Sequence, residues 1–504
     1  MPSVDNKRIA KNTLFLYMRM ILTILVNLYA VRVVWDVLGI EDYGVYNVVG
    51  GIVTMFAFLN NAMVASSQRF ISFELGTGNF NRLKKVFSIS VTVHILLAIG
   101  VLILAETIGL WFLNEKLNIP INRTYAANWV YQCSVIAFII NVISVPYNAC
   151  IVAHEHMKQY GYFGILEVIL KLVIVFLLLL IPFDKLIAYA ILVACVSLVM
   201  RLVYGFYCSR NFTECRYKFM NDHHLIRDMF SFAGWSFIGN LGFSVRDQGL
   251  NIIVNLFFNV AVNAAKGIAT QVGTVISGFV QNFQMALSPQ ITKRFAAGET
   301  GSMMTLVIAG CKYSALLMMF IVIPLYFASE DVLNFWLGDV APYTVGFMQL
   351  VLIISLIDSM VGPITTALQA TGHIKWFQII ISIIMVANLP LAWIWLKVET
   401  NPYIVLYVSI LTSAIALIAR LVLLHRQVAF SYRGFLLRVI GRIISVCILS
   451  GLSVWWIYSL ISHSITGLIL YTFMSLMIIA IVIYLLGLEG SERKILITTI
   501  IDRR

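Results

Sequence analysis

Long apolar runs separated by short polar stretches follow one another along nearly the whole chain. The runs are continuous rather than alternating, which excludes a β-barrel, and most have the roughly 20 residues that an α-helix needs to cross a bilayer. The pattern therefore predicts about 14 membrane-spanning helices. Their expected ranges are 12–34, 44–65, 86–112, 127–153, 161–181, 186–207, 229–258, 264–290, 303–327, 343–370, 376–397, 402–424, 439–461 and 464–488.

The composition points to the same class of protein. Of the 504 residues, 61% are hydrophobic and 12% are charged, whereas a soluble domain has about 45–50% apolar and about 25% charged residues. So little charge cannot cover the surface of a soluble protein of this length. A soluble enzyme, a disordered chain and a fibrous repeat are therefore excluded, and we expect an all-α polytopic membrane protein.

Basic residues gather in alternate loops between these spans. Loops on the side of the N-terminus hold 23 Lys and Arg residues, and loops on the other side hold five. The positive-inside rule then places both termini in the cytoplasm, and it explains the net charge of +12 without a nucleic-acid partner. The longest cytoplasmic loop has about 20 residues, too few for a catalytic domain. Its cysteines and histidines, at 208, 215, 223 and 224, have a spacing that fits no standard zinc finger.

The first twelve spans form two similar copies. PYNACIVAHEHMKQY begins at Pro146 and PITTALQATGHIKWF at Pro363, an offset of 217 residues that also aligns Ala153 with Ala370. Six spans is an even number, so both copies enter the membrane from the same side, as in transporters built from parallel bundles. The expected domains are a lobe over 1–210, a cytoplasmic linker over 211–228, a second lobe over 229–424, and an accessory span pair with a cytoplasmic tail over 425–504.

Polar residues concentrate in the first two spans of each copy. Those of the second span lie seven residues apart, which is two helical turns, so they form one stripe. A single such residue ordinarily makes a hydrogen bond between helices, but their concentration favours a shared water-filled cavity. The candidate cavity residues are Asn47, Thr54 and Asn61 in the second span, Gln248 in the seventh, and Gln271 and Asn282 in the eighth.

Several charges lie deep within the spans, where each costs about 2.5–3.5 kcal/mol. Glu167 and Lys171 are spaced i, i+4 and can pair with each other. Arg246 and Asp247 are adjacent, so they should point about 100° apart and not pair. The arginines at 201 and 420 lie near cytoplasmic span ends and should extend to the interface.

The remaining deep charges suggest how a substrate is held. Arg19, Arg246 and Lys312 have no partner close in sequence, which favours an anionic group on the substrate. Asp358 is a candidate site for a coupling ion, and the choice between H⁺ and Na⁺ stays open. No cofactor and no metal are expected.

Four segments carry a resemblance to a known group of transporters. They are RVVWDVLGIEDYGVYNVVGG (32–51), NNAMVASSQRF (60–70), GNLGFSVRDQG (239–249) and PITTALQATGHIK (363–375). They resemble the multidrug/oligosaccharidyl-lipid/polysaccharide (MOP) exporter superfamily and, within it, the Wzx-type polysaccharide-transport flippases. The resemblance covers the first twelve spans, and the additional span pair suits the fourteen-span flippases.

The resemblance implies a V-shaped, MATE-like transporter of two lobes in the bacterial inner membrane. It implies alternating access that carries an undecaprenyl-pyrophosphate-linked oligosaccharide to the periplasmic leaflet, for O-antigen, capsule or exopolysaccharide assembly. The polymerase and other assembly proteins are the partners to expect. A cationic cavity would meet the pyrophosphate, and Arg19 and Arg246 are the positions that we assign to it.

Other readings of the sequence stay open. A cation-coupled multidrug exporter of the same superfamily would favour acids in its cavity, whereas here four deep cations stand against three acids. A membrane polymerase, ligase or lipid-linked glycosyltransferase would be expected to use a sizeable external loop, and none is present. A channel would need a filter motif, which the sequence lacks.

Overall fold

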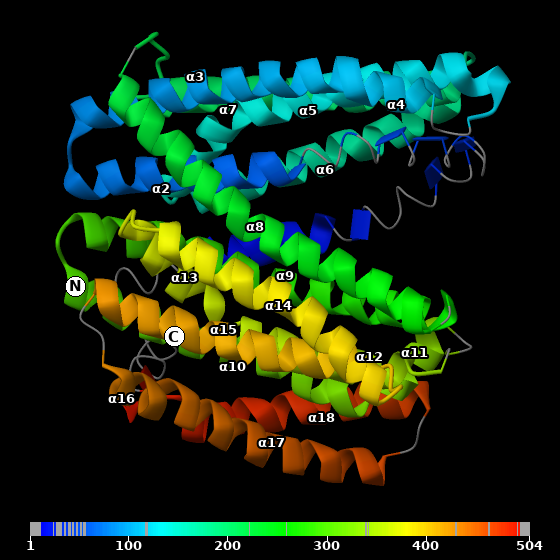
Figure 1. Ribbon diagram of the computed structural model, residues 1–504, viewed down its shortest axis with the longest axis vertical. Helices are drawn as coiled ribbons and strands as arrows, with labels where there is room; N and C mark the ends of the chain where they lie inside the picture. Colours follow the sequence, from blue (N-terminus) through cyan, green and yellow to red (C-terminus); the bar gives the residue numbers. More distant parts are fainter. Residues whose placement is uncertain are drawn as a thin grey trace, which may run out of the picture. The chain divides into compact units, whose positions relative to one another are not determined.

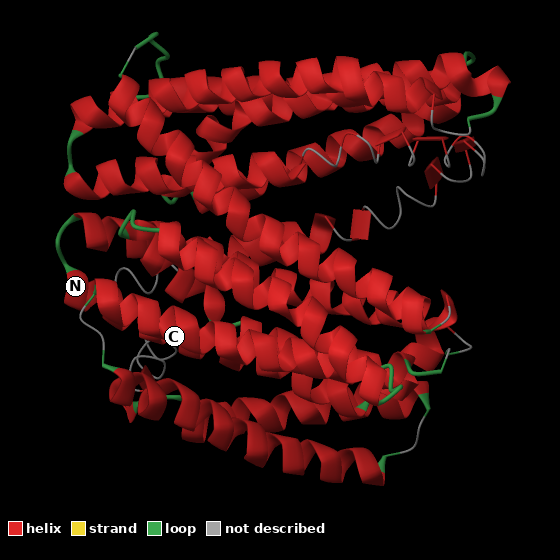
Figure 2. Ribbon diagram, viewed as in Figure 1, coloured by secondary structure: helices red, strands yellow, loops and turns green. Residues whose placement is uncertain are grey.

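A computed structural model describes residues 12–23, 25–26, 33–34, 37–38, 42, 45–46, 49–50, 53, 57–115, 119–220, 222–258, 260–337, 340, 342–428, 431–461, 464–490 and 492–493. Among these residues there are helices and no strands, as Figure 2 shows. The chain divides into an N-terminal unit, Arg8–Phe237, and a C-terminal unit, Ile238–Arg504 (Figure 1). The division falls within one long helix, nine residues after the expected start of the second lobe at 229. The predicted all-α fold is confirmed.

The N-terminal unit is organised around one helix, α5. Its helices are α2 (Ala57–Thr77), α3 (Phe80–Leu104), α4 (Leu110–Glu115), α5 (Thr124–Ala153), α6 (Met157–Leu180) and α7 (Lys185–Asn211). Helix α5 packs against α2, α3, α6 and α7. A π turn, Ala105–Gly109, joins α3 to α4, and the hydroxyl of Tyr131 in α5 donates to the carbonyl of Ala105 at 2.7 Å. A π turn leaves backbone groups free for such contacts.

The C-terminal unit contains the remaining helices. They are α8 (His223–Phe257, which begins in the N-terminal unit), α9 (Val260–Ala296), α10 (Thr300–Phe327), α11 (Ser329–Leu337), α12 (Thr344–Asp358), α13 (Val361–Ala370), α14 (Lys375–Val398), α15 (Ile404–Gln427), α16 (Tyr432–Phe435), α17 (Gly441–Leu460) and α18 (Ile465–Val482). Helices α17 and α18 pack against each other and against α10. They are the expected accessory pair.

Within the described part of the chain, ten helical segments are long and apolar enough to cross a membrane, and they correspond to ten of the predicted spans. Helices α8 and α9 occupy the seventh and eighth predicted spans with 35 and 37 residues, but they are too polar to be among the ten. The first two predicted spans are described only in part, over 12–23, 25–26 and 33–34 for the first and over 45–46, 49–50, 53 and 57–65 for the second. The polarity of α8 and α9 marks them as helices that do not face lipid on all sides.

The tenth predicted span, 343–370, is not the single helix expected. It breaks into α12 and α13, with Ser359 and Met360 in a turn between them. The carbonyl of Ser359 accepts a hydrogen bond from Nε2 of Gln284 at 2.7 Å, and that of Met360 from Sγ of Cys311 at 3.2 Å. These side chains satisfy the carbonyls that the break releases.

The turns at the helix ends support the internal repeat. Helices α5 and α13 end at the aligned alanines, and two residues later Glu155 has φ 61° and Gly372 has φ 79°. The two left-handed residues are themselves 217 positions apart. Gly78, between α2 and α3, and Gly298, between α9 and α10, likewise have φ 71° and 79°. A left-handed residue at matching places in each copy is what a duplicated bundle requires.

Candidate functional site

Helices α8 and α14 of the C-terminal unit approach each other closely along a row of glycines. A Cβ on Gly242 would lie 2.8 Å from the Cα of Ser382, closer than real side chains come. Side chains of α14 fill the corresponding space at Gly239 and Gly249. The three glycines therefore let α14 lie against α8, which explains part of the motif GNLGFSVRDQG.

Arg246 lies in this contact between α8 and α14. Its Nη1 donates to Sδ of Met385 at 3.3 Å, and its Nε donates to Oδ1 of Asp247 at 2.9 Å. The Arg246 side chain is 13% exposed and that of Asp247 is 60% exposed. The prediction that these neighbours do not pair is wrong, because it considered only the directions of their Cβ atoms. The guanidinium of Arg246 is several bonds away from its Cβ, so the long side chain can bend round the helix to the carboxylate of Asp247.

Four more charged groups interact electrostatically with Arg246, and some of them also with each other. They are Asp247, Lys266 of α9, Asp358 at the end of α12, and Arg420 of α15. We call these five residues the charge cluster. Three cations and two acids give it an excess of one positive charge. Charges are costly within a membrane, so such a cluster is a candidate functional site.

Lys266 is a member that sequence reasoning missed. Only 5% of its surface is exposed. Its Nζ donates to Oδ1 of Asn251 at 2.6 Å, the one hydrogen bond of this ammonium among the described residues. An ammonium has three donors, so it retains capacity for an anionic ligand. Its position near a predicted span end concealed it.

Arg420 is the second missed member. It is 3% exposed, so the predicted extension to the interface is wrong. The negative charge of Asp358 acts on Arg420 electrostatically and offsets part of the cost of its burial. In the N-terminal unit, the guanidinium of Arg201 lies 4.0 Å from the ring centre of Tyr147, and its extension to the interface stays a prediction.

A polar surface runs along α8 and α9 of the same unit. Its residues, which we call the polar face, are Gln248, Asn251 and Asn255 on α8 and Thr270, Gln271, Thr274 and Gln281 on α9, all exposed or half-exposed. Asn282 is half-buried beside them and donates to the carbonyl of Gly278 at 2.9 Å. Amides and hydroxyls are costly against lipid, so this face meets water, protein or substrate.

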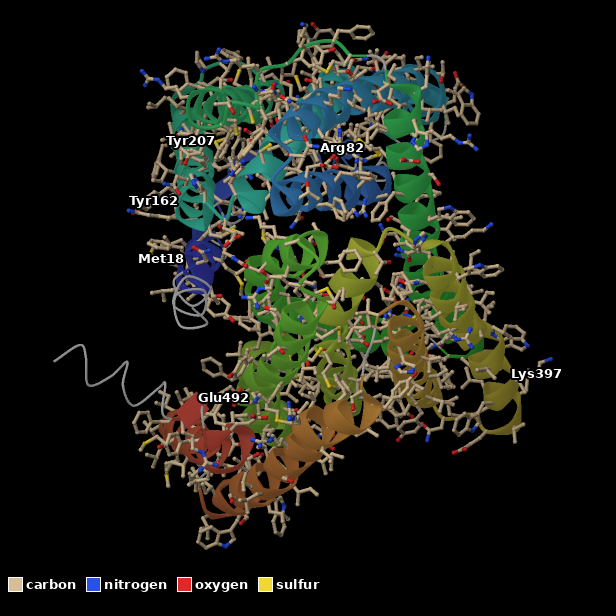
Figure 3. The ribbon with its side chains drawn as sticks, turned by 90° about the vertical axis from the view of Figure 1, so that its left-hand side faces the viewer. Met18, Arg82, Tyr162, Tyr207, Lys397 and Glu492 are labelled. Atoms are coloured by element: carbon tan, nitrogen blue, oxygen red, sulfur yellow. The ribbon has the colours of Figure 1, made fainter. Side chains whose placement is uncertain are left out.

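Arg19 lies within the N-terminal unit against α6. Its Cζ is 4.5 Å from the ring centre of Tyr160, and its side chain occupies the space beside Gly164. Figure 3 shows the same segment beside α6 at Met18. Glu167 acts on Arg19 electrostatically and also binds Nζ of Lys171 at 2.8 Å. Arg19 therefore has an acidic neighbour, but one that is distant in sequence.

Lys312 has a partner that is distant in sequence. Its Nζ is 2.6 and 2.7 Å from the two carboxylate oxygens of Glu492, which follows α18 (Figure 3). The pair joins α10 to the accessory helices. The spacing of 180 residues hides it from any local reading of the sequence.

Two of the candidate cavity residues lie outside the described part of the chain, and of a third only the backbone is described. Asn47 and Thr54 are not described, and Asn61 is placed within α2 without its side chain. The stripe that they form in the second span stays a prediction. The candidate site that the structure does describe consists of the charge cluster and the polar face, whose residues belong to α8, α9, α12 and α15.

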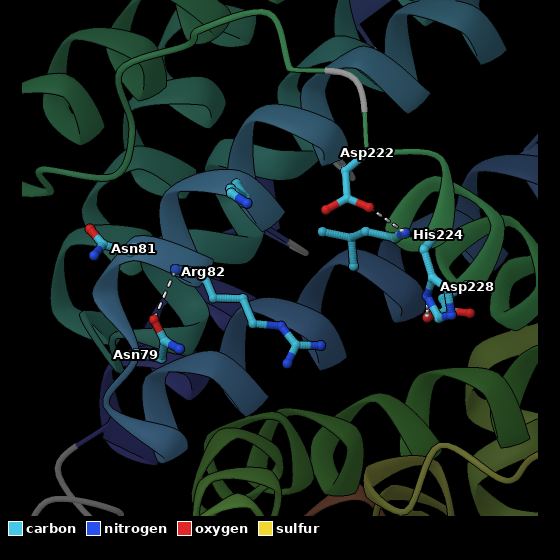
Figure 4. A pocket seen from close by; sticks show the side chains of 8 residues that line it. Asn79, Asn81, Arg82, Asp222, His224 and Asp228 are labelled. Carbon is cyan, nitrogen blue, oxygen red and sulfur yellow. Dashed lines mark hydrogen bonds and ion pairs between the residues drawn. The ribbon is translucent and has the colours of Figure 1, made fainter.

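Two other groups of residues in the N-terminal unit offer side chains that could bind a ligand. A pocket of about 430 Å³ is lined by Asn79, Asn81, Arg82, Lys85, Asp222, His224, Leu225 and Asp228 (Figure 4). Arg82 is bound to Glu74 at 3.0 Å and His224 to Asp228 at 3.1 Å. The zinc ligands considered above are not together, since Cys208 and Cys215 are buried while the side chain of His224 is 89% exposed.

Comparisons with known proteins give these features a context. The sequence matches the family model described as "Polysaccharide biosynthesis protein" over residues 9–295, and the model described as MatE over residues 236–394. A comparison with curated proteins gave no match.

Solved structures share the fold at low sequence identity. A MATE transporter in complex with MaD3S has a TM-score of 0.72 at 12% identity, covering 84% of this chain and 97% of its own. An outward-facing multidrug resistance MATE family transporter of the MOP superfamily has 0.70 at 14%, with 84% and 95% covered. A MOP superfamily transporter from Pyrococcus furiosus, described as having a binding pocket of reverse polarity that suggests a different function, has 0.68 at 14%, with 84% and 95% covered. The predicted MATE-like fold is thereby confirmed.

Proposed function

The chain belongs to the polysaccharide biosynthesis protein family of the MOP superfamily of transporters, and from this premise we propose that it is a flippase. It carries undecaprenyl-pyrophosphate-linked oligosaccharides from the cytoplasmic to the periplasmic leaflet of the bacterial inner membrane by alternating access, for O-antigen, capsule or exopolysaccharide assembly. The observation that carries the proposal is the polar face of α8 and α9 next to the charge cluster.

The two parts of this site suit the two parts of such a substrate. Amide and hydroxyl side chains both donate and accept hydrogen bonds, as sugar hydroxyls do, so the polar face suits the oligosaccharide. Arg246 and Lys266 suit the pyrophosphate. At about 5 Å and an effective dielectric constant of about 20, each cation–phosphate pair contributes about 3 kcal/mol before desolvation. Arg19 is the proposed counterpart in the N-terminal unit.

We place the coupling step at Asp358. This carboxylate ends α12 at a break in the middle of a predicted span, and transporters often bind coupling ions at such broken helices. Arg420 and Arg246 act on it electrostatically, so binding of H⁺ or Na⁺ at Asp358 would change the charge that the cluster presents to a phosphate. The identity of the ion is left to experiment.

A cation-coupled multidrug exporter is the second candidate function. The structures listed above as similar in fold include a multidrug resistance transporter, and the half-exposed Asp247 would suit a cationic drug. The charge cluster opposes this function, because its net charge is positive. A cationic drug would have to bind beside three cations.

An assay of lipid-linked repeat units by leaflet separates the two functions. In cells that lack the protein, we expect these units to accumulate on the cytoplasmic side, surface polysaccharide to be lost and drug sensitivity to stay unchanged. Normal surface polysaccharide together with higher sensitivity to cationic drugs would reject the flippase and favour the exporter.

Variants of Arg246 test the site itself. Arg246→Gln should lower translocation at least tenfold because one phosphate-binding cation is lost, while Arg246→Lys should retain part of the activity. Arg210→Gln removes an exposed cation at the end of α7 and is the matched control. The amount of protein in the membrane is measured in parallel. Full translocation by Arg246→Gln at normal abundance would remove Arg246 from the site.

A further inference from the structure

The loop between α7 and α8 begins with residues that are anchored inside the N-terminal unit. The ring of Phe212 stacks on His154 with centres 4.1 Å apart, and His154 forms an ion pair with Glu214. Cys215 is 2% exposed. The loop therefore leaves the unit at a defined point, directly before Arg216.

The next four residues, Arg216–Phe219, form an exposed segment in which basic and aromatic residues alternate. We call it the strap. All four residues are exposed, Tyr217 by 45% and Phe219 by 70%. Neither Arg216 nor Lys218 takes part in any ion pair among the described residues, and Lys84 of α3 adds a further cation nearby, close enough to act on Glu214. The strap therefore presents two cations that no ion pair within the described part of the unit neutralises.

Two hydrogen bonds hold the strap against α3. The backbone N–H of Lys218 donates to Oγ of Ser88 at 3.4 Å, and the hydroxyls of Tyr217 and Thr92 are 3.3 Å apart. Helix α3 belongs to a membrane-spanning segment, Phe80–Glu115. Thr92 lies six residues beyond the predicted start of the span at 86, which is about 9 Å along the helix.

The face of α3 that the strap touches continues into the membrane as an apolar surface. Leu96, Ile99 and Ile103 follow Thr92 at i+4, i+7 and i+11, so they lie on the same face. They are 52%, 49% and 57% exposed. Such a face meets lipid, and the strap covers its cytoplasmic end. Its aromatic rings then lie at the level of the head groups, where Tyr side chains are enriched.

We propose that the strap binds the head groups of anionic phospholipids in the cytoplasmic leaflet. A guanidinium and an ammonium match a phosphodiester in charge and geometry, and basic segments next to a span are attracted to anionic leaflets. The anchored start of the loop and its two bonds to α3 hold the cations in place. The strap thus makes the loop between α7 and α8 a lipid-binding element, independently of the transported substrate.

Photocrosslinking tests this proposal on the full-length protein. A benzoylphenylalanine replaces Phe219, and the protein is reconstituted into nanodiscs that contain labelled phosphatidylglycerol or labelled phosphatidylcholine. We expect crosslinking to phosphatidylglycerol in clear preference to phosphatidylcholine. Arg216→Gln/Lys218→Gln should lower that yield by about fivefold for each cation removed, and Arg216→Lys/Lys218→Arg should restore it.

The control removes two exposed cations from other loops on the predicted cytoplasmic side, in Lys375→Gln/Arg426→Gln. Its yield at position 219 should stay unchanged, and gel filtration and thermal stability of each variant report on folding. Equal crosslinking to both lipids, or the same loss in both double variants, would overturn the proposal. Crosslinking in cells to a protein instead of a lipid would overturn it in favour of an acidic protein partner.

Discussion

At the scale of single residues, three groups donate four hydrogen bonds to the carboxylate of Glu492. Nζ of Lys312 contacts both oxygens, the hydroxyl of Tyr313 lies at 2.7 Å, and the backbone N–H of Glu489 lies at 2.7 Å. The side chain of Lys312 is 4% exposed and that of Glu492 is 20% exposed. A buried ammonium without its carboxylate is costly, so Glu492 is required wherever Lys312 is present.

We predict that Glu492→Gln destabilises the protein by about 2–4 kcal/mol, because it leaves the charge of Lys312 buried without a counter-ion. The midpoint of thermal unfolding in detergent should fall by several degrees. Lys312→Met/Glu492→Gln removes both charges and should recover most of the loss. A double variant no more stable than the single one would show that the pair does not stabilise this part of the chain.

The same carboxylate gives a pH dependence. Burial alone raises the pKa of Glu492, but hydrogen bonds from Glu489, Lys312 and Tyr313 outweigh it, so that its pKa is lowered. The stability from this group is present above the unfolded pKa of about 4.3 and is lost as the pH falls through the lower folded pKa. Acidification from pH 5 to pH 3 should therefore lower the unfolding midpoint more in the wild type than in Lys312→Met/Glu492→Gln.

The residues of the candidate site were only partly predictable. Arg246 stands out in the sequence as a cation deep in an apolar run, and the structure places it in the charge cluster. Its bond to Asp247 was missed because spacing along a helix reports the direction of Cβ and not the reach of a long side chain. Lys266 and Arg420 were missed because burial is decided by other helices.

At the scale of helices, the glycines of α8 allow α14 to pack closely against it. We predict that Gly242→Ala destabilises the protein by about 1–3 kcal/mol, because the new Cβ would lie 2.8 Å from the Cα of Ser382. Gly234→Ala in the same helix meets nothing within 4 Å and should be neutral or slightly stabilising. Unfolding midpoints of the two variants, measured side by side, make the comparison. Equal midpoints would mean that α8 and α14 can separate at no cost.

The presence of a membrane-spanning helix can be predicted from the length of an apolar run. For this reason ten predicted spans coincide with apolar helices in the described part of the chain. The break between α12 and α13 lies four residues before Pro363, whose missing N–H leaves the carbonyl of Ser359 without its helical partner. Gln284 of α9, 75 residues away, binds that carbonyl instead. The proline is visible in the sequence, but the side chain that compensates for it is not.

At the scale of the whole molecule, duplication explains why much of the fold was predictable. The offset of 217 residues aligns sequence motifs, helix ends and left-handed residues in the two copies. The copies also differ, because α5 runs unbroken through Pro146 while the second copy breaks before Pro363. The charge cluster lies beside that break, so the function proposed here depends on the difference between the copies as much as on their likeness.

A parallel repeat makes a definite prediction about orientation in the membrane. Helix α6 separates Lys158 from Lys185, and helix α14 separates Lys375 from Lys397, all four of them exposed. Each helix has 24 residues, about 36 Å of helix, enough to cross a hydrocarbon core of about 30 Å. Because six spans is an even number, α6 and α14 must cross in the same direction.

Single cysteines at these four positions test the prediction, in a background where Cys195 and Cys447 are serine. A membrane-impermeant maleimide should label positions 185 and 397 in spheroplasts, and positions 158 and 375 only after the membrane is permeabilised. Labelling of 158 and 397 from outside would mean that the copies are inverted relative to each other. The site would then be shared between opposed bundles, and the assignment of Arg19 as the counterpart of Arg246 would fail with the parallel repeat.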